Sequence, residues 1–160
     1  MKKLFLNPFT ILAIGSILYT GCTSNNPYKS WNDNLINEKA PVRLVKDKTF
    51  TKKNATRYIE DWAGVKGESI IDDNSKKQAF KLIEKHCGHK KENFIESRIV
   101  KYTKNNWEEV WLFQDEKSYR PDKISGLTVF FEYNTKTNEN RTRLFGKCHT
   151  GRGTSFTNFN

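Results

Sequence analysis

The sequence predicts an α+β domain in which two N-terminal helices pack on a four-stranded antiparallel β-meander. Apolar residues recur at helical spacing in the first half of the chain, and β-branched and aromatic runs separated by turn residues fill the second half. Two cysteines are placed so that a disulfide would join these halves. With 160 residues, 36% of them hydrophobic, the chain can bury one modest core.

The first predicted helix covers residues 54–63. Asn54 supplies a cap and Gly64 ends the helix. One face, at positions i, i+3, i+4 and i+7, is formed by Ala55, Tyr58, Ile59 and Trp62.

The second predicted helix starts at a cap supplied by Asp73 or Asn74 and stops at Gly88. Its apolar face consists of Ala79, Phe80, Ile83 and Cys87. Most of its lysines lie outside that face, so we expect them to be exposed to solvent.

Four strands are expected at residues 94–103, 107–114, 127–134 and 141–148, because each run is rich in β-branched and aromatic residues and is followed by turn residues. A helix followed by an antiparallel meander is similar to the element order of cystatin-like folds. That resemblance concerns element order alone.

The second strand carries large apolar side chains on both faces. Trp107, Trp111 and Phe113 alternate with Val110 and Leu112. A two-layer domain leaves one sheet face polar and wet, so we expect the second face to be covered. The cover is either the segment 23–72 or a partner.

The N-terminus has the pattern of an export signal. Lys2 and Lys3 precede an apolar stretch at residues 9–19, which is shorter than the roughly 20 residues of a membrane-spanning helix. Thr20 and Gly21 then lead to Cys22.

This segment resembles the lipobox of bacterial lipoproteins. The resemblance implies cleavage before Cys22 and lipidation of its thiol and amine, which would hold the protein to a membrane. The next residue is Thr23. An aspartate in that place usually retains Gram-negative lipoproteins at the inner membrane, so the resemblance implies the outer membrane, facing the periplasm.

These signals divide the chain into four parts. We expect a signal peptide at 1–21, a lipidated N-terminus with a flexible polar tether at 22–53, a single α+β domain at 54–150, and a loose polar tail at 151–160.

Two cysteines remain after Cys22 is used as the anchor. Export places Cys87 and Cys148 in an oxidising compartment, so we expect them to form a disulfide that joins the second helix to the last strand. All three histidines lie beside these cysteines. His86, His89 and His149 are therefore candidate metal ligands, against the plainer interpretation that a cross-linked helix end carries histidines.

Catalytic motifs are lacking from the sequence, which has no serine nucleophile elbow and no zincin pattern. The carboxylates along the second strand and its turn are expected to be solvated rather than paired as acid and base. These are Glu108, Glu109, Asp115 and Glu116. We therefore expect a protein without enzymatic activity and without a cofactor.

The charge balance favours anionic partners. The net charge is +10, and it remains +8 when Lys2 and Lys3 are removed with the signal peptide. Export disfavours nucleic acid as a partner. The sequence thus predicts an envelope lipoprotein with a small basic binding domain for an envelope protein or an anionic polymer. The alternative is a periplasmic metal-binding protein that uses the three histidines.

Overall fold

The computed structural model describes residues 27–137 and 139–159. Within them the chain is an α+β domain with two α-helices and eight strands. In chain order the elements are α1 (Pro27–Asn37), β1 (Val42–Lys46), β2 (Ala55–Trp62), β3 (Val65–Gly67), α2 (Asp73–Cys87), the short 3₁₀ turn η1 (Lys91–Asn93), β4 (Phe94–Tyr102), β5 (Asn106–Gln114), β6 (Ile124–Asn134), β7 (Glu139–Phe145) and β8 (Ser155–Phe159).

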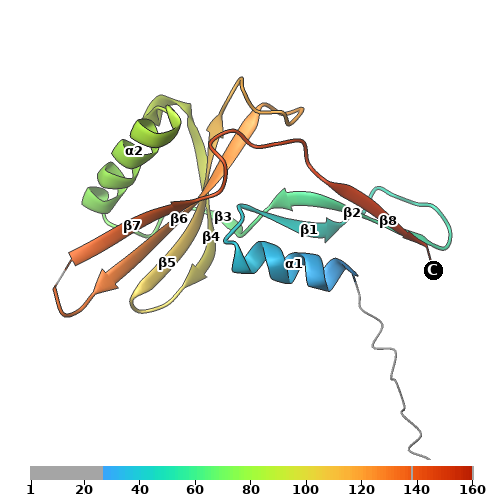
Figure 1. Cartoon of the computed structure of the whole chain (residues 1–160), viewed down its shortest axis with the longest axis horizontal. Coiled ribbons are helices and arrows are strands. Elements are labelled where there is room, and N and C mark those ends of the chain that lie inside the picture. Colours follow the sequence, from blue (N-terminus) through green and yellow to red (C-terminus); the bar gives the residue numbers. More distant parts are fainter. Residues whose placement is uncertain (1–26, 138, 160) are drawn as a thin grey trace, which may run out of the picture.

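The strands form two antiparallel sheets. One has three strands in the order β1-β2-β8, and the other has five in the order β3-β4-β5-β6-β7. Figure 1 shows α2 on one side of the five-stranded sheet and the three-stranded sheet with α1 on the other. The predicted four-stranded meander was therefore wrong. The short strand β3 pairs with β4 at the edge of the sheet, and α2 lies between these two strands in the sequence.

The second predicted helix is present as α2. Its cap is Asp72, one residue earlier than expected, whose side chain accepts a hydrogen bond from the Ser75 amide at 3.0 Å. Gly88 ends the helix with φ of 74°, a left-handed conformation that glycine adopts without steric cost. Ala79 and Ile83 on its apolar face are fully buried.

The first predicted helix does not exist, because residues 55–62 form the strand β2. This strand is the centre of its sheet and pairs with β1 on one side and β8 on the other. An apolar spacing over eight residues fits either a helix or a strand. Pairing with the neighbouring β1 and with the distant β8 decides in favour of the strand, and the spacing within residues 55–62 cannot show this pairing.

Part of the expected tether is ordered structure, since residues 27–46 contain α1 and β1. The side chain of Asn32 joins the two elements. It donates to the Leu44 carbonyl at 2.9 Å and accepts from the Leu44 amide at 2.8 Å. Leu44 itself has no exposed surface. Residues 1–26, with the expected signal peptide and Cys22, lie outside the described residues.

The expected loose tail also contains a strand. β8 pairs with β2 in register, so that Phe156 lies opposite Tyr58, and their rings stack at 5.1 Å between centroids. The polar composition of this tail hides a strand whose hydrogen bonds go to a segment about 100 residues earlier.

Both faces of the five-stranded sheet are covered by the chain itself. On one side α2 packs over Trp111, Phe113 and their neighbours. On the other side Val110 and Leu112 are buried in a second cluster formed with Val42, Trp62 and Ala63. The segment that we expected as a possible cover, within residues 23–72, supplies that second layer.

Trp62 packs against the five-stranded sheet. Its indole ring lies directly over Gly126 of β6, where a side-chain Cβ would collide with Cζ3 of the ring and lie 3.0 Å from Leu112. The guanidinium of Arg120 lies 4.4 Å from the centre of the Trp62 ring. Only glycine at position 126 leaves room for this arrangement.

We predict that Gly126→Ala will lower the free energy of unfolding by about 1–3 kcal/mol, the usual cost of overpacking a core. Thermal unfolding followed by circular dichroism measures the loss. Gly151→Ala is the matched control, because a Cβ at Gly151 meets nothing within 4 Å. Equal melting temperatures for the two variants would contradict the packing argument.

Candidate functional site

The disulfide between Cys87 and Cys148 is present, as the sequence predicted. Its Cα atoms lie 5.0 Å apart, and the bond closes a sequence separation of 61 residues. Cys87 is the last residue of α2, whereas Cys148 lies three residues beyond the end of β7 rather than within the strand. The bond therefore ties the end of the helix to the segment that follows β7.

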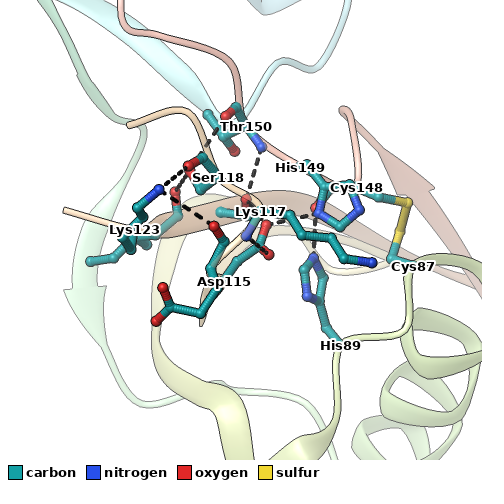
Figure 2. A network of polar contacts seen from close by, with 12 residues as sticks. Cys87, His89, Asp115, Lys117, Ser118, Lys123, Cys148, His149 and Thr150 are labelled. Atoms are coloured by element: carbon teal, nitrogen blue, oxygen red, sulfur yellow. Dashed lines mark hydrogen bonds and ion pairs between the residues drawn. A yellow bond between two sulfur atoms is a disulfide. The ribbon is translucent and has the colours of Figure 1, made fainter. Parts of the chain in front are cut away.

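Two of the three candidate histidines meet beside this disulfide. The rings of His89 and His149 lie 5.7 Å apart, and His89 is buried with 4% of its surface exposed. Figure 2 shows His89 directed toward Cys148 and His149, and its Nε2 lies 2.6 Å from the Cys148 carbonyl oxygen. His86 is exposed on the last turn of α2 and is not part of this cluster.

The third member of the cluster is Asp115, at the end of β5. Its Oδ2 lies 2.9 Å from Nδ1 of His149 and accepts a hydrogen bond from the Ser125 hydroxyl at 2.6 Å. Burial acts to raise the pKa of Asp115, but the hydrogen bonds from Ser125 and His149 outweigh it, and the pKa lies below its ordinary value. Asp115 is therefore an anion at neutral pH.

Further hydrogen bonds hold the segment after β7 in place, as Figure 2 shows. The amide of Thr150 donates to the Ser125 hydroxyl at 2.8 Å, and the hydroxyl of Thr150 accepts from the Gly126 amide at 3.0 Å. The Ser118 hydroxyl lies 2.8 Å from the Ile124 carbonyl and is buried. His149 thus stands on a segment that is fixed to β6 and to the β5–β6 loop.

The expectation that the four carboxylates along β5 and its turn are solvated was wrong for three of them. Glu108, Glu109 and Asp115 are buried, and only Glu116 is exposed. Sequence shows that Asp115 directly follows a strand and begins a turn, and its carboxylate accepts from the Lys117 amide at 3.0 Å. Its burial depends on the distant segment around His149, so strand alternation alone could not reveal it.

Glu109 has no exposed surface, although its side chain is a carboxylate. One carboxylate oxygen accepts from the Trp111 indole at 2.8 Å. The other accepts from the Ser69 hydroxyl and the Ile70 amide, both at 3.2 Å. Glu109 therefore fixes the connection between β3 and α2, which forms one end of a cleft.

This aromatic cleft, of about 490 Å³, opens between α2 and the edge of the five-stranded sheet. Its floor is a cluster of Phe80, Phe94 and Trp111, with ring centroids 4.7–5.5 Å apart. The lining residues are Lys66, Gly67, Glu68, Ser69, Lys76, Phe80, Phe94, Glu96, Ser97 and Trp111.

The cleft exists because α2 is held toward β7 at both of its ends. Asn140 of β7 donates to the Ser75 hydroxyl in the first turn at 3.0 Å. The disulfide fixes the last turn to the segment after β7. On the opposite flank of the helix, Phe80 and Phe94 are only partly buried, and together with the buried Trp111 they form the floor of the cleft.

A lysine-rich surface continues from the cleft along α2. A neighbouring hollow of about 530 Å³ shares Lys76 and Phe80 with the cleft and is lined by Asp73, Lys76, Lys77, Phe80, Lys81, Glu84 and Lys91. Lys76 lies 3.8 Å from Asp73, so its charge is only weakly compensated. We call the exposed Lys77, Lys81 and Lys91 with Lys76 the lysine face.

Neither described helix, among residues 27–137 and 139–159, has the length and apolar character needed to cross a bilayer. No protein-family model matches the chain, and comparisons with curated proteins and with solved structures find no match either.

We predict that replacing Cys87 or Cys148 with Ser will cost about 2–5 kcal/mol of stability, because the cross-link restricts the unfolded chain across a long loop. Thermal unfolding measures this, and mass spectrometry of unreduced peptides should find the two residues joined. The parent protein and both variants carry Cys22→Ser, so that no thiol outside the cross-link is present. Two free thiols in the folded, exported protein would contradict the prediction.

Proposed function

We propose that the chain is a lipid-anchored protein of the bacterial cell envelope whose domain binds a partner and carries out no reaction. The export signal at residues 1–21 and the lipobox-like sequence before Cys22 support the anchor. We place the domain on the periplasmic side of the outer membrane, since Thr23 follows the cysteine.

The folded domain starts very close to the proposed anchor. α1 begins at Pro27, five residues after Cys22, and an extended chain of that length spans at most about 18 Å. This supports a domain that sits against the membrane, in place of one on a long tether. Figure 1 shows that the start of α1 and the end of β8 lie at the same end of the molecule.

The chemistry of that end suits an anionic lipid surface. Four lysines lie in and after β1, at positions 46, 48, 52 and 53. The one acid among them, Asp47, accepts from Nε of Arg57 at 2.7 Å. Nearby, Phe159 is 67% exposed and lies beside Lys52. Basic and aromatic side chains together favour the headgroup region of a bilayer.

The observation that carries the binding function is the aromatic cleft with the lysine face beside it. A cleft of this volume is in the range of ligand sites, and an aromatic floor offers apolar contact at a fixed position. Lys66 is paired with Glu96 at 2.6 Å, so the uncompensated charge lies on the lysine face. The partner that fits is an anionic envelope ligand that carries an apolar group.

We predict that Lys76→Gln combined with Lys81→Gln will weaken binding of 1-anilinonaphthalene-8-sulfonate, an aromatic anion, severalfold. Each exposed ion pair contributes about 0.2–1 kcal/mol, and added salt should reduce the difference between variant and parent protein. Titration followed by the fluorescence of the probe gives the affinity.

Lys48→Gln combined with Lys53→Gln is the matched control, because it removes the same charge in the connection between β1 and β2, which lies far from α2 in Figure 1. Unchanged binding in this control supports the cleft and the lysine face as the site. An equal loss in both variants would show that only the overall charge matters, and the binding proposal would fail.

We predict separately that Cys22→Ser will move the protein out of the membrane fraction, because the acylated residue is lost. Fractionation with immunoblotting measures the distribution. Thr23→Ser is the control for a neighbouring change that keeps the cysteine. Normal processing together with full membrane retention of Cys22→Ser would refute the anchor.

A further inference from the structure

Three potential metal ligands from separate parts of the chain lie close together beside the disulfide (Figure 2). His89 follows α2, Asp115 ends β5, and His149 follows β7. One ligand atom of each residue lies within 4.8 Å of the ligand atoms of the other two. His89 and Asp115 are 4% and 7% exposed, and His149 is partly exposed.

We propose that His89, Asp115 and His149 form a binding site for a divalent transition-metal ion of the zinc type. Two imidazole nitrogens and one carboxylate are a ligand set that zinc accepts, and three protein ligands leave one position open. Ligand atoms around a tetrahedral zinc ion lie about 3.4 Å apart, so the three side chains need to close by at most about 1.4 Å.

The surrounding residues hold the proposed ligands in place. The Ser125 hydroxyl and the Lys117 amide donate to the Asp115 carboxylate, which fixes its orientation and keeps it anionic. The ring of His89 lies nearly parallel to Phe113, with centroids 5.2 Å apart. Support of this kind from groups behind the ligands is typical of metal centres.

The disulfide fixes the distance between the two histidine segments. Cys87 is two residues before His89, and Cys148 is directly before His149. With Cys87 and Cys148 joined, both imidazoles are held in the same region before any ion arrives. Because both sulfur atoms are in the disulfide, the cysteines act here by positioning the histidines and not as ligands.

Metal binding replaces hydrogen bonds that the cluster already makes. His149 Nδ1 lies 2.9 Å from Asp115 Oδ2, and His89 Nε2 lies 2.6 Å from the Cys148 carbonyl oxygen. A ring nitrogen binds metal only when it carries no proton. On binding, the proton on a ligating nitrogen moves to the other nitrogen of the same ring, so the imidazole does not have to lose a proton.

The cluster opens on one side to a polar hollow of about 570 Å³, which includes His149 in its wall. This hollow provides an entry route and room for a fourth ligand. The other residues that line it are Glu116, Lys117, Ser118, Tyr119, Lys123 and Arg152. Three of them are basic, which lowers the affinity for a bare cation but favours hydroxide or another anion as the fourth ligand.

The test uses the chain with Cys22→Ser, purified with its disulfide intact. Titration with Zn²⁺ by calorimetry should show one saturable site per chain. Titration with Co²⁺ should give the visible absorption bands of a bound ion with nitrogen and oxygen ligands. His149→Ala should weaken binding at least about tenfold, as expected when a ligand is lost.

His86→Ala is the matched control, because His86 is beside the same disulfide but exposed and outside the cluster. It should change the affinity less than about twofold. Asp115→Asn, which keeps the shape of the side chain, is a second ligand variant in case His149→Ala unfolds. The proposal fails if the parent protein binds no ion at 1:1 stoichiometry, or if His86→Ala and His149→Ala behave alike. Neither result bears on the lysine face.

Discussion

The contact between Trp62 and Gly126 is the constraint on which the arrangement of the two sheets depends. Trp62 ends the central strand of the three-stranded sheet, and Gly126 lies near the start of β6 in the five-stranded sheet. An indole buried on this scale contributes about 4–6 kcal/mol, from 150–250 Å² of apolar area. Val42, Val110 and Leu112 surround it and extend the contact across both sheets.

The opposite face of the five-stranded sheet is covered by α2, and the position of this helix is set by its two ends. There α2 is attached to one flank, by Asn140 at its first turn and by Cys148 at its last turn. Because both attachments lie on the β7 side, the aromatic rings of the other flank remain reachable from outside. The placement of α2 toward β7 thus accounts for both sites. The aromatic cleft lies along the helix, and the histidine cluster lies at its C-terminal end.

Local signals were sufficient to predict the parts of the fold that depend on local sequence. The apolar face of α2, its end at Gly88, and the alternating residues of β5 can all be seen in short windows. The disulfide was predicted from the number of cysteines and the expected compartment, and the structure confirms it.

The elements that were not predicted from the sequence depend on pairing with other segments of the chain. β2 was taken for a helix because its pairing with β1 and β8 could not be seen in its own residues. The same holds for the site. Asp115 was expected to be solvated, and it became a candidate ligand only because the segment carrying His149 covers it.

The position of β8 has a consequence for the order in which the molecule is assembled. β8 pairs with β2, near the beginning of the domain, so β2 has a free edge until the chain has been made as far as β8. Contacts of such long sequence separation form slowly. The five-stranded sheet and α2 need nothing beyond Thr150, so they can form first. A chain that stops before Ser155 would then keep an open, aromatic strand edge, which is a surface for unwanted pairing with other chains.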